Sequence, residues 1–71
     1  MKKFSVKELR VRNNLTQAQS AEKLGVSTQT YNAWEKDISK VAIGKVASIA
    51  KLYGVTIEEI FLPENVKNIH I

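Results

Sequence analysis

The chain has 71 residues, no cysteine, a single proline and only three glycines. Without cysteine there is no disulfide or thiolate metal site, and an oxidising compartment gains no support. No apolar run approaches membrane-spanning length, and the opening MKKFSVKELR lacks the apolar segment of a secretion signal. The single histidine, His70, has no acidic or cysteine partner at ligand spacing. We therefore expect a cytoplasmic protein with no metal, no cofactor and no membrane contact.

What the sequence does contain is an ordinary globular composition with a basic balance. Apolar residues make up 44% and charged residues 25%, and so short a chain can build only one core, which predicts a single domain over residues 1–71. The formal net charge is +4, which favours a polyanion as partner. Positive charge gathers in residues 1–12 and again after Trp34, while glutamates gather near the far end.

Helix starts are marked by side chains that can satisfy the free amides of a first turn. Ser5-x-x-Glu8, Thr16-x-x-Gln19 and Thr56-x-x-Glu59 each match the capping-box pattern, and Ser27 is a further N-cap candidate. Gly25 and Gly54 stand where a helix would end in a left-handed residue. The expected helices cover residues 6–13, 17–24, 28–36, 42–53 and 57–62, and Pro63 stops the last one.

Helices this short depend on tertiary burial, so their apolar faces predict the core. The expected core residues are Val6, Leu9, Leu15, Ala21, Leu24, Val26, Tyr31, Trp34, Ile38, Ile43, Val46, Ile49, Ala50, Val55, Ile60 and Phe61. Tyr31 and Trp34 are three residues apart and share one helix face, which turns the opposite face outward.

Both ends of the chain show loose alternation of apolar and polar residues. Phe4 and Val6 alternate in this way, and so do Val66, Ile69 and Ile71. This fits short terminal strands that pair with each other, and for residues 63–71 also a dimer contact or a disordered terminus.

The run LTQAQSAEKLGVSTQTYNAWEKD, residues 15–37, resembles the helix-turn-helix of the Cro/CI-type family, the small phage repressors and their bacterial relatives. The tail IAKLYGVTIEEIF, residues 49–61, is similar to the fourth and fifth helices of this family. The resemblance covers residues 5–62 and implies an all-α, compact five-helix, lambda repressor-like fold with its helix-turn-helix at 17–36. Two departures are Ser20, where the family usually has leucine, and Asp37, where its turn usually has glycine.

By this resemblance, residues 28–36 form the recognition helix that enters the major groove of DNA. Uncharged side chains suit base edges, because an amide can bind adenine with two hydrogen bonds and a threonine methyl can contact thymine. The residues expected to read bases are Thr28, Gln29, Asn32 and Ala33. The residues expected to contact phosphate are Gln17, Thr16, Lys36, Lys40, Lys45 and Gly44. Gly44 would permit either a close approach of backbone to phosphate or close helix packing. Arg10 and Glu35 are expected to form a structural ion pair.

The expected function is a sequence-specific regulator of transcription, in the role of a repressor, that binds double-stranded DNA as a homodimer. The alternative is a protein-binding module, such as an antitoxin-like or adaptor subunit, that uses an apolar surface with Val11, Phe4 and Ile71. An enzyme is not expected, since no nucleophile–base pair or phosphate loop is visible in the sequence.

Overall fold

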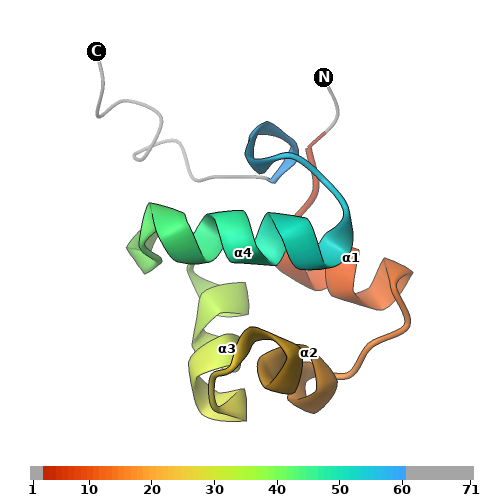
Figure 1. Cartoon of the computed structure of the whole chain (residues 1–71), viewed down its shortest axis with the longest axis vertical. Coiled ribbons are helices and arrows are strands. Elements are labelled where there is room, and N and C mark those ends of the chain that lie inside the picture. The colour runs from red at the N-terminus through yellow and green to blue at the C-terminus, as the bar shows by residue number, and fades with distance from the viewer. Residues whose placement is uncertain (1–2, 61–71) are drawn as a thin grey trace.

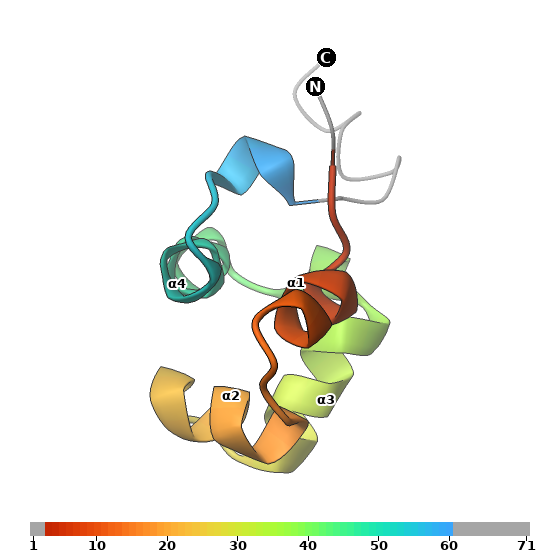
Figure 2. The same cartoon turned by 90° about the vertical axis from the view of Figure 1, so that its right-hand side faces the viewer.

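The computed structural model describes residues 3–60, which form an all-helical arrangement (Figure 1). Four α-helices and two single 3-10 turns follow one another within these described residues. In order they are α1 (Val6–Arg12), α2 (Gln17–Leu24), α3 (Thr28–Lys36), η1 (Ile38–Lys40), α4 (Ile43–Tyr53) and η2 (Ile57–Glu59). In both views α2 and α3 lie together at the end of the molecule opposite to the start of the described chain (Figures 1 and 2).

The predicted helix starts are confirmed by their hydrogen bonds. The Ser5 hydroxyl accepts from the backbone N–H of Glu8 at 3.1 Å, and Thr16 and Gln19 form a complete capping box. Ser27 caps α3 by accepting from the N–H of Thr30 at 3.1 Å. The predicted bounds of the first four helices differ from the observed ones by at most one residue, at the end of α1 and at the start of α4.

The turn between α2 and α3 is closed by a left-handed glycine. Gly25 has φ +73°, a conformation that glycine adopts without strain, and it brings the N–H of Val26 back to the carbonyl oxygen of Ala21 at 3.0 Å. The chain therefore leaves α2 and enters α3 within three residues, which fixes the angle at which α3 is presented.

The fifth predicted helix, residues 57–62, is wrong in extent. Only the 3-10 turn Ile57–Glu59 forms, and Ile60 adopts an extended conformation with φ −85° and ψ 129°. Ile60 is fully buried and makes an isolated parallel bridge with Phe4, whose N–H donates to the carbonyl oxygen of Glu59 at 2.7 Å. Pairing with the N-terminal segment thus replaces the helix. Phe61 and Leu62 lie outside the described residues.

The predicted terminal strands reduce to this one bridge within residues 3–60. Val6 is already the first residue of α1, because the cap at Ser5 starts the helix there. The proposed strand partners Val66, Ile69 and Ile71 lie outside the described residues, as does the whole of 63–71.

The core lies between α4 and the other helices. Its buried apolar residues are Val6, Leu9, Ala21, Tyr31, Ile38, Val46, Ile49, Ala50, Tyr53 and Ile60. All of these were predicted except Tyr53. The prediction was wrong for Ile43, which is 67% exposed because the first turn of α4 extends past the helices beneath it (Figure 1). Leu15, Leu24, Val26, Trp34 and Val55 are only partly buried at its edge.

A line of hydroxyl groups crosses this core. The Tyr53 hydroxyl donates to the Ser20 hydroxyl at 2.8 Å, and the hydroxyls of Tyr53 and Tyr31 lie 2.5 Å apart. Ser20 is fully buried and accepts the hydrogen bond of the Tyr53 hydroxyl, which a leucine at this position could not do. Burial, together with hydrogen bonds to Tyr53 and Glu35, raises the pKa of Tyr31.

Asp37 ends α3 and starts the next turn. Its φ is −153°, an extended value that does not require glycine. Its carboxylate accepts hydrogen bonds from both the backbone N–H and the hydroxyl of Ser39, which keep the pKa of Asp37 below its ordinary value. The aspartate thus caps η1 in a loop where the resemblance led us to expect glycine.

Candidate nucleic-acid interface

The outward face of α3 is polar and uncharged. Thr28, Gln29 and Ala33 are exposed, and Asn32 is half-buried beside them. All four belong to the first two turns of α3, directly after the Ser27 cap. The predicted base-reading residues therefore share one surface, although Asn32 is less exposed than the others.

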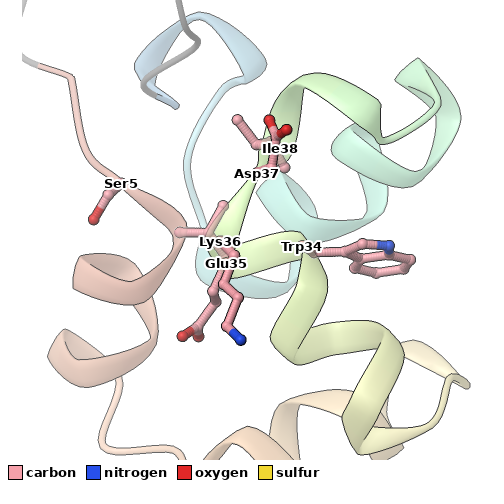
Figure 3. Close-up of a pocket in the computed structure, with 7 residues that line it drawn as sticks. Ser5, Trp34, Glu35, Lys36, Asp37 and Ile38 are labelled. Carbon is pink, nitrogen blue, oxygen red and sulfur yellow. The ribbon is translucent and has the colours of Figure 1, made fainter.

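Two aromatic side chains hold α3 from its other side, to different degrees. Tyr31 is fully buried, whereas Trp34 is half-buried and packs edge-on against Tyr31 with ring centroids 6.3 Å apart. Figure 3 shows Trp34 projecting from α3 away from α1, while Glu35 points toward α1. Tyr31 therefore fixes α3 in the core, and Trp34 packs at the edge of the core.

The ion pair between Arg10 and Glu35 ties α3 to α1. The Arg10 Nε donates to Glu35 Oε2 at 2.6 Å, and the Arg10 Nη1 donates to the carbonyl oxygen of Leu15 at 3.0 Å. The two side chains are 15% and 6% exposed, respectively. Arg10 thus donates to both Glu35 and the backbone of Leu15, which agrees with a structural role.

Each member of this ion pair favours the charged form of the other. Burial by itself would raise the pKa of Glu35, but hydrogen bonds from Arg10, Gln17 and Tyr31 outweigh it, and the pKa lies below the ordinary 4.5. The hydrogen bond to Glu35 raises the pKa of Arg10 in turn. Glu35 is therefore a carboxylate, able only to accept hydrogen bonds, at neutral pH.

Gln17 connects this ion pair to the outward face of α3. Its Nε2 donates to Glu35 Oε1 at 3.0 Å, and its Oε1 accepts from Asn32 Nδ2 at 3.1 Å. Neither bond was predicted, because the spacing of Gln17 and Asn32 along the chain carries no sign of their contact. Gln17, predicted to contact a phosphate, and Asn32, predicted to contact a base, are thus also bonded to each other.

The other predicted phosphate contacts occupy two places. Lys36 and Lys40 are exposed and line an open pocket of about 400 Å³ with Ala33 and Trp34. Gly44 and Lys45 are exposed in the first turn of α4, whose N-cap residue Ala42 makes no side-chain cap. The free amides of that turn are available to an anion.

Close helix packing within residues 3–60 does not require glycine at position 44. A Cβ placed there would meet no heavy atom of the described residues within 4 Å. Thr16, by contrast, already uses its hydroxyl to cap the N–H of Gln19 at 3.0 Å.

A second pocket, of about 200 Å³, lies between the start of α1 and the end of α3 (Figure 3). It is lined by Ser5, Val6, Trp34, Glu35, Lys36, Asp37 and Ile38. Within residues 3–60 there is no group of three side chains suited to hold a metal ion. No helix in that range has the length and apolar content to cross a membrane.

Two helices joined by a tight glycine turn, the second with a polar outer face, are the geometry of a helix-turn-helix, and the helix-turn-helix family model matches residues 6–60. The chain belongs to the helix-turn-helix family. The match spans every helix and 3-10 turn that the structure describes in residues 3–60 of this helix-turn-helix protein.

Three curated relatives are similar to this helix-turn-helix protein. An uncharacterized HTH-type transcriptional regulator of Methanocaldococcus jannaschii is 44% identical over 63 residues, which are 89% of this chain and 96% of the relative. The cryptic phage CTXphi transcriptional repressor RstR of Vibrio cholerae is 38% identical over 55 residues. The uncharacterized regulator YobD of Bacillus subtilis is 33% identical over the same length. The last two matches cover 78% of this chain and about half of each relative, 50% and 49%. No solved structure matches the chain significantly.

Proposed function

We propose that this helix-turn-helix protein is a sequence-specific regulator of transcription that binds double-stranded DNA as a repressor and reads the major groove with α3. The observation that carries the proposal is the exposed amide and hydroxyl face of α3, held from behind by the fully buried Tyr31. The names of its relatives, two regulators and a phage repressor, support the same function.

The residues of this face have distinct proposed roles. Gln29 and Asn32 each offer an amide that can bind adenine with two hydrogen bonds, worth about 1–3 kcal/mol of discrimination per contact. Thr28 offers a methyl group to thymine or a hydroxyl to a phosphate, and Ala33 is small enough to let the helix approach closely.

The flanking charges are proposed to hold the phosphates on either side of the groove. Lys36, Lys40 and Lys45 supply positive charge, and the free amides near Gly44 supply hydrogen bonds. The open space around Gly44 supports an approach of backbone to phosphate. Gln17 retains one amide hydrogen for a phosphate, and the backbone after Thr16 is the start of α2.

A homodimer is the proposed binding unit, because one domain of this size covers only about 600–1,000 Å² of DNA. Two copies would read half-sites about 34–36 Å apart, one helical turn of B-DNA.

Salt dependence tests whether DNA is the partner. If the three lysines of each subunit neutralise phosphates, log affinity for a duplex falls with log salt with a slope of about −5 for the dimer. Lys40→Gln should make the slope shallower by about 2 and weaken all sequences alike. Lys51→Gln, at the far end of α4, is the matched control and should leave the slope unchanged. Binding that hardly responds to salt would contradict DNA as the partner and favour the protein-binding alternative.

A further inference from the structure

The hydrogen bonds that link Arg10 to Asn32 cross three helices and converge on Glu35, which accepts from both sides. Arg10 Nε on α1 donates to Glu35 on α3, and Gln17 Nε2 on α2 donates to the other oxygen of the same carboxylate. Asn32 Nδ2 then donates to Gln17 Oε1. A buried charge pair is thereby joined to a side chain of the reading face through a single glutamine.

The chemistry of Glu35 fixes the direction of this chain. A carboxylate has no hydrogen to donate, so Gln17 can only present its NH₂ group to it. The carbonyl oxygen of Gln17 then faces Asn32 and can only accept, so Asn32 must turn its own NH₂ group inward. The orientation of both amides follows from the charge on Glu35.

An Asn32 held in this way presents one pattern to the outside. Its nitrogen carries two hydrogens, of which one is used by Gln17, so one hydrogen and the Oδ1 acceptor remain. Adenine offers the complement, an N7 acceptor beside an N6 amino donor. Guanine offers two acceptors and would set its O6 against Oδ1, and thymine offers an acceptor and a methyl group.

Resting on the proposed function, we propose that Gln17 and Glu35 are positioning residues that lock the Asn32 amide so that it selects adenine. Gln29 forms the internal contrast, because its exposed amide makes no hydrogen bond within the described residues. The amide of Gln29 can turn to suit the base that it meets. The orientation of the Asn32 amide is already fixed before DNA binds, by its hydrogen bond to Gln17.

The test uses the purified full chain and a duplex selected from random DNA by the wild type. Asn32→Ala identifies the base position whose selectivity depends on Asn32, and Gln29→Ala identifies a second, independent position. Gln17→Met then removes both amide bonds while keeping the side-chain length and the Arg10–Glu35 pair. We expect the wild type to prefer adenine at the Asn32 position by about 10-fold or more, and Gln17→Met to reduce that preference by about 5-fold. The preference at the Gln29 position should not change.

A role for Gln17 in phosphate contact alone would give a different result. Affinity would fall equally for all bases and the preference ratio would stay constant, which would overturn the inference. A base other than adenine at the Asn32 position would also overturn it. If the wild type enriches no sequence at all, the proposed function fails instead.

A measurement on the free wild-type protein needs no variant. Nitrogen-15 relaxation of the side-chain amides should show the NH₂ group of Asn32 well ordered and that of Gln29 mobile, since only the former is bonded. Equal mobility of the two groups would overturn the inference whatever the stability of Gln17→Met.

Discussion

Glu35 accepts hydrogen bonds from Arg10 on α1 and from Gln17 on α2, so one carboxylate ties α3 to both preceding helices. The side chain is only 6% exposed, which makes its charge costly to leave unpaired. The negative charge of Glu35 therefore contributes to the stability of the helix-turn-helix.

Stability should depend on pH through Glu35. Its folded pKa lies below 4.5, so the stabilisation is present above that pH and is lost as pH falls through the folded pKa. Glu35→Gln should cost about 3 kcal/mol at pH 7, because it leaves Arg10 partly buried without its counter-charge. Urea unfolding of both proteins from pH 7 to about pH 2.5 should show this difference shrinking below pH 4.5. A difference that stays constant over the range would contradict the account.

A substitution at Gly44 should affect stability and DNA binding in opposite directions. Because a Cβ there would meet no heavy atom of residues 3–60 within 4 Å, Gly44→Ala should stabilise the protein by about 0.5 kcal/mol through helix propensity. If the backbone at Gly44 approaches phosphate, the same change should weaken DNA binding several-fold for all sequences. Thermal unfolding and fluorescence anisotropy measure the two effects. Ser48→Ala, one turn later on the exposed side of α4, is the control and should leave binding unchanged; an equal loss in both variants would contradict the phosphate contact.

At the scale of the elements, side-chain caps start α1, α2 and α3, while hydrogen-bonded hydroxyls in the core connect α2, α3 and α4. Ser20, Tyr31 and Tyr53 come from these three helices, and their hydroxyls form one buried line. Within residues 3–60 no buried side-chain polar atom is left without a hydrogen bond. The line is therefore complete, and breaking it at one point leaves a partner unsatisfied.

A double-mutant cycle tests the coupling between α2 and α4. Tyr53→Phe should cost about 1–2 kcal/mol and Ser20→Ala about 1 kcal/mol, because each leaves a buried hydroxyl with one partner fewer. The double variant should cost about 1 kcal/mol less than the sum, since both members of the bond are then gone. Urea unfolding supplies the free energies; strict additivity would mean that the Ser20–Tyr53 bond contributes nothing to stability.

The local structure could be predicted from the sequence, whereas the contacts between helices could not. Ser5, Thr16 and Ser27 predicted three helix starts because a cap acts within four residues of itself. The burial of Tyr31 and the exposure of Gln29 followed from helical spacing. The extended conformation of Ile60, by contrast, depends on Phe4 more than fifty residues away, and the bond from Gln17 to Asn32 depends on the packing of α2 against α3. The spacing of apolar residues predicts which side of one helix is buried, but it does not predict which residues of separate elements meet.

At the scale of the whole molecule, the uncharged outward face of α3 and the lysines beside it have two separate proposed roles in DNA binding. In the proposed function Gln29 and Asn32 distinguish bases, while Lys36 and Lys40, at the edge of the same surface, raise affinity for any duplex. Phosphate charge would then bring the protein to DNA, and amide contacts would select the site.

The most direct test of this account is selection of random duplex DNA by the purified protein, repeated with the double variant Gln29→Ala/Asn32→Ala. We predict that the wild type enriches a near-palindrome with half-sites about one helical turn apart. The double variant should stay folded, with an unfolding midpoint lowered only by the loss of the Asn32–Gln17 hydrogen bond, and should keep its salt-dependent binding, yet enrich no common sequence. If the double variant enriches the same palindrome as the wild type, α3 does not read DNA through these two amides and the central claim is wrong.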